Sequence, residues 1–434
     1  MARIKLLPML LGLSFLAAGG QVPSNTGRWI VSTNYLGTPL TPLLNLEQTG
    51  EKVTATSRGY KYVGTLHGTA LHLMATDEQG NTDEITATLT DGKMEGTDTE
   101  TDAHDKAHPM TLKFAAILAP ALEHPQPQTH EFTPTVFYRQ VSAFNKPVLT
   151  INPGDTIHTT TVDAGGTDMN GVKRSLGGNP QTGPFYITGA MPGDVLVVHI
   201  KKLILNRDWA ESDDGLDERA LNSDLAVKVK ENGKSVRWHL DRAAGTATPE
   251  TPAEHLKHYT IPLKPMLGCI SAAPGTAQAP PGTGDSGYYG GNMDFNEIRE
   301  GATVYLRVAN PGALLYFGDA HAAQGDGELN GNALETSMDV ELTVDVIPNK
   351  RIGDPRVETA TDIITMGLDG SLDDAFKEAT SDMASWLEED YKLTPSEIAQ
   401  VLGTAAEYHV SEVADRNAGI VLRINKARLA TLVK

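Results

Sequence analysis

The segment GDAHAAQGDGE, residues 318–328, gathers four side chains that can bind a metal ion or carry a proton: Asp319, His321, Asp326 and Glu328. If the apolar run before it continues as a β-strand, alternate side chains share a face, so Asp319 and His321 emerge together. Imidazole beside carboxylates is a suitable ligand set for Zn²⁺ or a similar cation. The competing interpretation is a polar turn in which Asp caps its own backbone.

Other polar positions could join this segment. Asp294 follows a glycine-rich turn in YYGGNMDFNEI, and Asp163 ends the strand-like stretch GDTIHTTTVDAGG. The turn at Thr182 and Gly183 could offer a hydroxyl or backbone N–H groups to a substrate. Glu335 begins the strictly alternating segment ETSMDVELTVDV and is its acidic residue nearest to the cluster. Each of these residues has an ordinary structural interpretation as well.

Cys269 offers a chemistry other than metal binding, because a cysteine thiolate can act as a nucleophile. It is the only cysteine of the chain and stands among small residues in PMLGCISAAP. No histidine is adjacent in sequence, although His239, His255 or His258 could approach it in the fold. A solitary cysteine in such surroundings is more often a small buried hydrophobic residue.

Composition and charge restrict the class of protein. The 434 residues include 42 Gly and 25 Pro, and 40% are hydrophobic, which favours a β-rich fold with many turns and a sizeable core. The formal net charge of −19 argues against nucleic acid or an anionic membrane surface as a partner.

The N-terminus has the pattern of a secretory signal peptide. Residues 1–20 place Arg3 and Lys5 before the apolar run Leu6–Ala18, and small residues follow. The run is too short to span a membrane comfortably. With one cysteine the chain can form no internal disulfide, which fits a bacterial periplasmic or secreted protein. We therefore expect an exported protein that is not membrane-bound in its mature form.

The pattern of strands and turns divides the rest of the chain. Residues 27–120 alternate polar and apolar residues between closely spaced turns and predict a small all-β domain. Residues 121–134 are rich in Pro and predict an exposed linker. Residues 135–434 predict a large antiparallel, sandwich-like β domain that carries a helical tail near 371–410. The expected fold class is therefore mainly β with C-terminal α, or α+β.

Two helices are expected in the tail. Leu372, Ala375, Phe376 and Ala379 have helical spacing, and Ser371 can cap the helix that they form. Thr394, Pro395 and Glu397 form a stronger start signal, with an N-cap, a proline at the first position and a capping box. Their apolar faces predict packing on the sheet or on a neighbouring subunit.

Several segments resemble the acetamidase/formamidase family over residues ~135–350, and the resemblance continues towards the tail. They are NPQTGPFYITGAMPGDVLVVHI, GCISAAP, GGNMDFNEIREGATVYLRV and GALLYFGDAHAAQGDGELNGNALET. The resemblance implies hydrolysis of a short-chain amide such as formamide or acetamide to the acid and ammonia. It also implies a β-rich core with helices and assembly as a homodimer or larger homo-oligomer. Residues 27–120 lie outside the resemblance.

The resemblance also implies roles for particular residues. We expect Asp294, Asp319 and His321 to hold a divalent metal, with zinc first and calcium second. Glu328 is the candidate general base, and Glu335 stands behind it. A carboxylate near a metal can move protons while the ion activates water.

Three further positions complete the expected site. Asp326 is a third catalytic candidate, and Asp163 is either a further ligand or a substrate anchor. Thr182 and Gly183 are expected to contact the substrate. Two alternatives stay open at this point: a non-catalytic ligand-binding protein on an amidase-like fold, and an amidase that depends on Cys269. The export signal and the additional N-terminal domain depart from the usual cytoplasmic amidase and put the small-amide substrate in question.

Overall fold

The computed structural model describes residues 25–229 and 233–432, so the expected signal peptide over residues 1–20 lies outside the described residues. The chain forms two compact units. The first comprises Leu43–Leu118 and the chain up to Trp29, and the second comprises Ile30–Pro42 and Ala119–Lys434.

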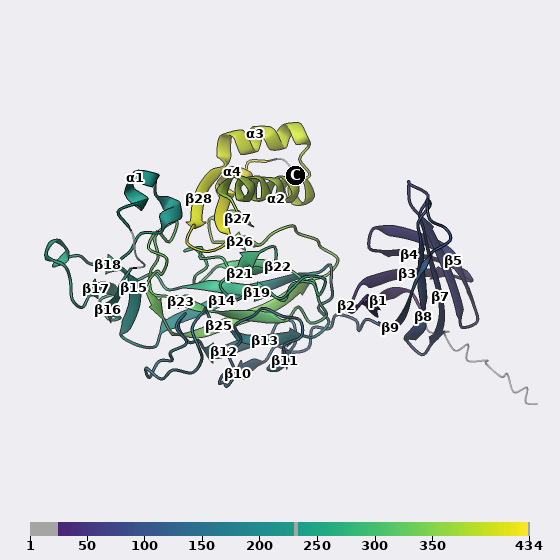
Figure 1. Ribbon diagram of the computed structural model, residues 1–434, viewed down its shortest axis with the longest axis horizontal. Helices are drawn as coiled ribbons and strands as arrows, with labels where there is room; N and C mark the ends of the chain where they lie inside the picture. The colour runs from purple at the N-terminus through teal and green to yellow at the C-terminus, as the bar shows by residue number, and fades with distance from the viewer. Residues whose placement is uncertain (1–24, 230–232, 433–434) are drawn as a thin grey trace, which may run out of the picture. The chain divides into compact units, whose positions relative to one another are not determined.

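Strands β1 to β9 form one sheet that closes on itself, because β1 also pairs with β9 (Figure 1). Its strands alternate buried and exposed residues, as in β4 and β7, which is the pattern that alternation in the sequence predicts. Trp29, Leu46, Leu73 and Met94 are buried inside. The strands are β1 (Gly27–Tyr35), β2 (Thr38–Leu40), β3 (Leu43–Thr49), β4 (Lys52–Ser57), β5 (Tyr60–His67), β6 (Ala70–Thr76), β7 (Thr82–Thr90), β8 (Lys93–Thr101) and β9 (Met110–Leu118).

Two large sheets build the second unit. The first runs in the order β10-β12-β25-β14-β22-β26-β27-β29-β28. Its strands are β10 (Thr129–Glu131), β12 (Thr156–Thr160), β14 (Val195–Leu205), β22 (Thr303–Arg307), β25 (Met338–Ile347), β26 (Arg356–Glu358), β27 (Asp362–Asp369), β28 (Glu407–Glu412) and β29 (Ala418–Asn425).

The second sheet runs in the order β18-β17-β16-β15-β24-β23-β19-β21-β20, with β13 paired to β23 and β11 to β13. Its strands are β11 (Leu149–Ile151), β13 (Thr182–Ile187), β15 (Trp209–Asp213), β16 (Ser235–Asp241), β17 (Thr246–Pro249), β18 (Ile261–Pro262), β19 (Met266–Ala272), β20 (Ser286–Gly287), β21 (Gly290–Asn292), β23 (Leu315–His321) and β24 (Glu335–Thr336).

One apolar core joins the two sheets face to face. Leu196 and Leu342 enter it from the first sheet, and Ile270 and Phe317 enter it from the second. Phe185 stacks on Phe317 at a ring-centroid distance of 5.6 Å. The mainly β, sandwich-like prediction is therefore confirmed.

Two details differ from the prediction. The pairs β10–β12 and β11–β13 are parallel, so the architecture is not wholly antiparallel. Strand β10 also lies within the predicted linker 121–134. Its backbone hydrogen bonds with β12 place this proline-rich stretch at a sheet edge, where few ladder donors are needed.

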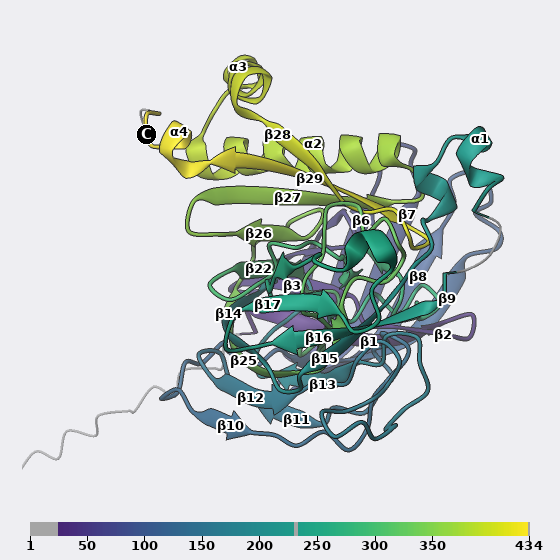
Figure 2. The ribbon, with the colours of Figure 1, turned by 90° about the vertical axis from the view of Figure 1, so that its left-hand side faces the viewer.

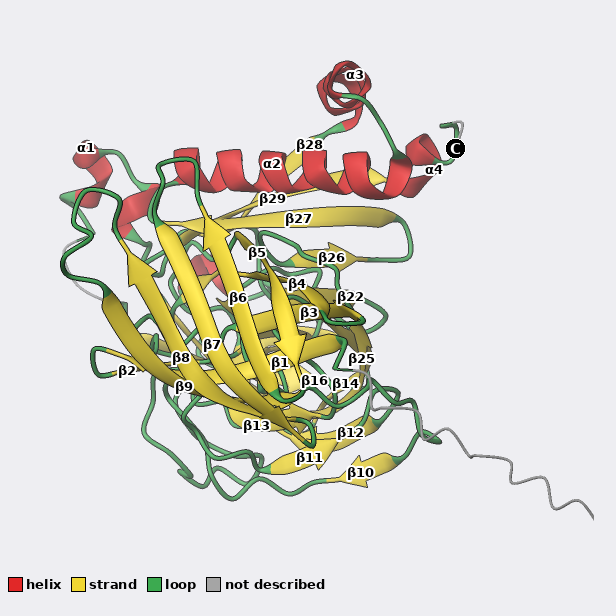
Figure 3. Cartoon of the chain, turned by 90° about the vertical axis from the view of Figure 1, so that its right-hand side faces the viewer, coloured by secondary structure: helices red, strands yellow, loops and turns green. Residues whose placement is uncertain are grey.

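The helices cover one part of the first sheet. Figures 2 and 3 show α2 (Leu372–Tyr391) lying along β27 and β29, with α3 (Pro395–Ala405) beyond it. Ser371 Oγ accepts the Asp374 N–H at 3.1 Å, and the Glu397 carboxylate accepts the Thr394 N–H at 2.8 Å. The predicted tail to residue 410 runs too far, because β28 begins at Glu407 and pairs with β29.

The remaining helical segments are short. They are η1 (Glu218–Ala220), α1 (Ser223–Ala226), η2 (Glu254–Leu256) and α4 (Lys426–Leu429). Among the described residues, no helix combines the length and the apolar character needed to cross a membrane.

Candidate active site

Strand β23 carries Asp319 and His321 into the interior of the second unit. The neighbouring strand β24 pairs with it so that His321 faces Glu335. His321 Nε2 lies 3.1 Å from Glu335 Oε1 and 3.5 Å from Asp319 Oδ1. Direct cross-strand neighbours have the closest Cβ atoms in a sheet, so the strand register itself brings Glu335 to the histidine.

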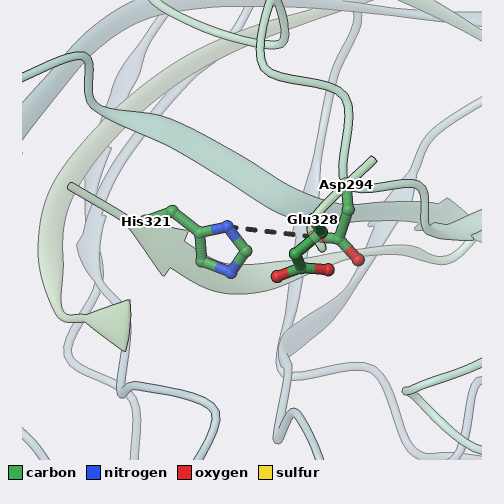
Figure 4. A group of neighbouring side chains, drawn as sticks. All are labelled: Asp294, His321 and Glu328. Carbon is green, nitrogen blue, oxygen red and sulfur yellow. Dashed lines mark ion pairs between the residues drawn. The ribbon is translucent and has the colours of Figure 1, made fainter. Parts of the chain in front are cut away.

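Two loops add acids to the other side of the same imidazole. Figure 4 shows Asp294 and Glu328 beside His321, whose Nδ1 lies 3.9 Å from Asp294 Oδ1. One ligand atom from each of these three residues lies within 4.8 Å of the others. A second such group, Asp319 and Glu335 with His321, shares the histidine. The imidazole therefore stands between two pairs of carboxylates.

The backbone at these positions is itself unusual. Asp294, Asp319 and Glu328 have φ angles of 40°, 56° and 45°, in the left-handed region that side chains other than Gly rarely adopt. Such conformations persist where the surrounding structure holds them, and they concentrate at functional sites. Three positive φ angles in one cluster indicate that the surrounding structure holds a locally unfavourable backbone, which orients these carboxylates.

Gly268 on β19 leaves room for two of the carboxylates, those of Asp294 and Asp319. A Cβ atom at this position would stand 2.4 Å from Asp294 Oδ1 and 2.5 Å from Asp319 Oδ2. Such contacts are closer than real Cβ atoms tolerate, so only glycine lets both carboxylates approach this strand.

Burial governs the protonation of the cluster. Desolvation and the neighbouring carboxylates raise the pKa of Glu328 to about 8 and that of Glu335 to about 7. Burial, together with Glu328 and Asp319, raises the pKa of Asp294 well above its usual value. For His321, burial lowers the pKa, but Glu335 and Asp319 outweigh it and raise the pKa well above the ordinary value.

Buried polar atoms without hydrogen-bond partners show whether a cation would fit the cluster. Asp294 Oδ1, Asp319 Oδ1, Glu335 Oε2 and His321 Nε2 are buried and make no hydrogen bond among the described residues. Buried polar atoms without partners are rare and costly. Carboxylate oxygens and one imidazole nitrogen are the donor types that a divalent cation such as Zn²⁺ accepts. The residues therefore fit the metal that the sequence predicts.

Asp326 lies outside the cluster, contrary to the prediction. Its side chain is 51% exposed, and its carboxylate accepts from Asn296 Nδ2 at 2.7 Å and contacts His409 Nδ1 at 2.9 Å. Although it stands two residues before Glu328, the chain turns at Gly327, which has a φ of 84°, so the expected shared face does not form.

Asp163 stands behind the site rather than in it. Its Oδ2 lies 2.8 Å from Arg207 Nη2, and its Oδ1 accepts the Thr167 N–H at 2.8 Å. The same arginine donates from Nη2 to the Glu335 carbonyl oxygen at 3.2 Å. Both carboxylate oxygens of Asp163 are thus paired with protein groups. Asp163 therefore positions Glu335 through Arg207 and does not serve as a metal ligand or substrate anchor.

Thr182 and Gly183 also serve the fold. The Thr182 hydroxyl donates to the Thr160 carbonyl at 3.2 Å, and both residues are buried. A Cβ at Gly183 would lie 2.5 Å from the Leu315 carbonyl oxygen, so this glycine permits close packing against β23. The Thr182 hydroxyl is therefore already paired within the protein, and Gly183 serves the close packing of β13 on β23.

Amide side chains that the sequence analysis missed organise the acids. Asn292 Oδ1 accepts from Asn179 Nδ2 at 2.8 Å, and its Nδ2 donates to Asp294 Oδ2 at 2.5 Å. Asn179 Nδ2 also lies 3.3 Å from Asp319 Oδ2. Gln324 Oε1 lies 2.8 Å from His321 Nδ1. Asn292 and Gln324 each stand two residues before a predicted acid, Asp294 and Asp326, and this spacing could have found them; Asn179 has no predicted acid near it in the sequence.

The turn between β28 and β29 supplies two further acids. Asn292 Nδ2 donates to the Asp415 carboxylate, and Glu412 Oε2 accepts the Asp415 N–H at 3.1 Å. Burial raises the pKa of Glu412 to about 9 and that of Asp415 to about 6. Both residues lie beyond the predicted helical tail and more than eighty residues from Glu328, and this distance in sequence hid them from the sequence analysis.

Cys269 lies beside the cluster but is poorly suited to attack. Its Sγ is 3.6 Å from Asp319 Oδ2 and 2.7 Å from Asn292 Oδ1, and the residue is fully buried. Burial and then Asp319 raise the pKa of the thiol well above its usual value. Among the described residues, its hydrogen bonds include none to a histidine. A nucleophilic cysteine needs the opposite environment.

Another acidic group lies in the first unit. Asp83, Asp98 and Glu100 come together there, but Arg58 pairs with all three at 2.7–3.2 Å. The guanidinium already supplies the positive charge that a cation would bring. This group is therefore an ion-pair network of the closed sheet in which only Asp83 is fully buried.

Comparisons with known proteins agree with the geometry. The model of the acetamidase/formamidase family matches residues 272–361, within the second unit. A protein from Schizosaccharomyces pombe, whose name gives formamidase as an inferred activity, is 28% identical over 217 residues, covering 39% of this chain and 52% of the relative. The chain thus spans about half the length of this curated relative.

Solved structures extend the likeness. An acetamidase from Yersinia enterocolitica is 29% identical with a TM-score of 0.62, over 71% of this chain and 94% of that one. An acetamidase from Bacillus halodurans is 27% identical with a TM-score of 0.58, over 70% of this chain and all of that one (100%). The motifs, the sandwich and these matches agree: the second unit is similar in sequence and in fold to proteins of the acetamidase/formamidase family.

Proposed function

We propose that this protein hydrolyses the C–N bond of a short-chain linear amide, of the formamide or acetamide type, to a carboxylic acid and ammonia. The observation that carries the proposal is the convergence of Asp294, Asp319, Glu328 and Glu335 on one buried histidine, His321. Non-catalytic binding alone gives no reason for so many buried acids with unsatisfied oxygens. The family similarity supports the same reaction class.

Amide hydrolysis needs a sharpened water nucleophile, stabilisation of the developing oxyanion, and a proton for the leaving nitrogen. Glu328 is the proposed general base, because its carboxylate is buried beside His321 and is not one of the three proposed metal ligands. Its Oε1 accepts the Ala333 N–H at 3.0 Å, which fixes the carboxylate. Glu335, held through Arg207, is proposed to pass the proton on to the nitrogen.

Asp294, Asp319 and His321 are the residues proposed to hold a divalent metal, zinc first and calcium second. Such an ion would supply Lewis-acid stabilisation of the negative charge that develops on the carbonyl oxygen. Gln324 contacts Nδ1 of His321 and thereby orients the imidazole, leaving Nε2 towards Asp319 and Glu335. Asn292 orients the Asp294 carboxylate in the same way.

Ammonia release from formamide and acetamide tests the proposal. We expect turnover by the purified protein, bound divalent metal by elemental analysis, loss of turnover with a chelator, and recovery when the metal is returned. Thiol alkylation should leave turnover intact, because Cys269 is buried and its thiol stays protonated. Inactivation by alkylation together with indifference to chelators would instead favour the Cys269 mechanism, and no turnover of any amide would favour a binding protein.

We also propose export and self-association, which rest on the sequence and on the family resemblance. The mature protein is expected in the periplasm or medium, cleaved near residues 18–21. It is expected to form a homodimer or larger homo-oligomer. N-terminal sequencing and light scattering of the mature protein test the two points; an uncleaved cytoplasmic monomer would reject both.

A further inference from the structure

The side-chain amide of Asn292 connects two of the acids that are proposed to hold the metal. Asn292 is 2% exposed, and its Nδ2 donates to Asp294 Oδ2 at 2.5 Å. Its Oδ1 accepts from Asn179 Nδ2 at 2.8 Å. Asn179 Nδ2 in turn lies 3.3 Å from Asp319 Oδ2. Two amides in series therefore join the carboxylate of Asp294 to that of Asp319.

These contacts engage the same oxygen of each carboxylate. Oδ2 of Asp294 and Oδ2 of Asp319 are paired with the amides, whereas the two Oδ1 atoms are buried and make no hydrogen bond among the described residues. The Oδ1 atoms are also the ones that face His321, at 3.9 Å from Nδ1 and 3.5 Å from Nε2. A carboxylate that is held through one oxygen presents the other to an ion. The two amides thus select the oxygen that each acid offers.

Asp415 fixes the orientation of the Asn292 amide. Asn292 Nδ2 donates to the Asp415 carboxylate as well as to Asp294, so acceptors meet its N–H₂ end. Donors meet its oxygen, namely Asn179 Nδ2 and Cys269 Sγ, the latter at 2.7 Å. A flipped amide would turn its oxygen towards two carboxylates and its N–H₂ group towards two donors. Without Asp415, one N–H of this buried amide would lose its acceptor, which is costly.

The turn between β28 and β29, which carries Asp415, is itself held against the site. Glu412 Oε2 accepts the Asp415 N–H at 3.1 Å, and Arg219 Nη1 donates to the Asp415 carbonyl. Asn417 Nδ2 donates to the Ser286 carbonyl at 2.6 Å. Ser286 lies on β20, which pairs with β21, the strand that carries the central amide. The position of the Asp415 carboxylate is therefore a built feature of the second unit.

The same C-terminal segment also holds the loop of the proposed base. The N–H of Gly327, the residue before Glu328, donates to the Val410 carbonyl at 2.9 Å. The Val413 N–H donates to the Gly327 carbonyl at 3.1 Å. The hairpin of β28 and β29 is thus part of the wall of the site, although it lies outside residues 272–361, which the family model matches.

We propose that Asp415 is a positioning residue for the metal site. Acting through Asn292, it holds the ligand carboxylates so that their Oδ1 atoms face the ion. This inference rests on the proposed metal-assisted function and adds the C-terminal turn to it. Groups that orient metal ligands from outside typically change metal affinity or activity by about 10- to 100-fold when they are removed.

The affinity of the full-length protein for Zn²⁺, measured by competition with a chromogenic chelator and without any amide, tests this inference. We expect D415A to weaken the Kd by about 10- to 100-fold. D415N should stay close to the wild type, because its side-chain oxygen can still accept the Asn292 N–H. R416A is the matched control in the same turn: its exposed guanidinium pairs with Asp285 at 3.4 Å, and its loss should leave the Kd unchanged.

A double-mutant cycle shows whether Asp415 acts through the amide. N292A should weaken Zn²⁺ binding, and the double variant N292A/D415A should be no weaker than N292A, because the residue that transmits the effect is already gone. Losses that multiply in the double variant would overturn the inference. A loss in D415N as large as that in D415A would also overturn it, because the charge of Asp415 would then act on the ion directly. D415L, which also lacks an acceptor, replaces D415A if the alanine variant does not fold.

Further measurements separate this inference from the proposed function. If the Zn²⁺ affinities follow the expectation and no amide is hydrolysed, the proposed function fails and the positioning role stands. If amides are hydrolysed and D415A matches the wild type in kcat and Kd, the positioning role is overturned. If the wild type binds no Zn²⁺, crystal structures of D415A and D415N answer the question. An Asn292 amide displaced in D415A alone supports the role, and one unmoved in both variants overturns it.

Discussion

Replacing Glu328 with Gln is expected to lower kcat for amide hydrolysis by about 10²- to 10⁴-fold, the contribution of a positioned general base. The amide is nearly isosteric and can still accept the Ala333 N–H, but it cannot take a proton from water. The fold should survive, because the substitution removes one of several buried acids that repel one another, among them Asp294 and Glu335.

Steady-state kinetics and metal analysis of the same preparation check this expectation. The metal content should be retained in E328Q, since the proposed ligands are Asp294, Asp319 and His321. Asp326→Asn is the matched control two residues earlier: it makes the same chemical change on a half-exposed carboxylate outside the cluster, and it should retain wild-type kinetics. An unimpaired E328Q enzyme would exclude Glu328 as the base and transfer that role to Glu335.

Replacing Asp382 with Ala is expected to lower the free energy of unfolding of the second unit by about 3–5 kcal/mol. Asp382 on α2 receives two hydrogen bonds from Arg356 on β26, at 2.6 Å from Nε and 3.0 Å from Nη2. Both side chains are buried, at 5% and 2% exposure. The variant would leave an uncompensated guanidinium under the helix, and Arg356 Nη1 already lacks a partner among the described residues.

Scanning calorimetry of the wild-type and variant proteins measures the loss. Glu389→Ala, an exposed acid on the same helix, is the control and should change stability by no more than about 0.5 kcal/mol. The double variant R356M/D382L should recover much of the loss, because a buried ion pair can be exchanged for packed apolar groups at little cost. A loss below about 1 kcal/mol in D382A would show that this pair does not hold the helix.

Local patterns in the sequence were sufficient to predict the strands and helices near the site. Strand alternation and turn residues predict β23, β25 and a small all-β domain over residues 27–120, and the capping residues Ser371 and Thr394 mark where α2 and α3 begin. The motif segments predict Asp294, Asp319, His321, Glu328 and Glu335 together, and the structure brings these five into one cluster. These signals are local, because propensity and capping act within a few residues.

The errors of the sequence analysis concern where side chains point and which polar groups are already paired. Asp326 and Glu328 are two residues apart, but Gly327 turns the chain and sends one carboxylate to solvent and the other inside. Asp163 and Thr182 have the right chemistry, yet Arg207 and the Thr160 carbonyl already pair with them, and Gly183 is needed for close packing against the Leu315 carbonyl. Spacing alone does not reveal which polar groups the fold has already paired.

The sequence by itself determined which residue types are available, the mainly β class, the caps of α2 and α3, and the family that its motifs resemble. Only the tertiary structure decided that Asn292, Glu412 and Asp415 join the acids. The physical reason is that partners more than a hundred residues apart meet through strand register and sheet packing. The burial of each side chain then depends on neighbours from the whole core, and a short segment of sequence does not specify those neighbours.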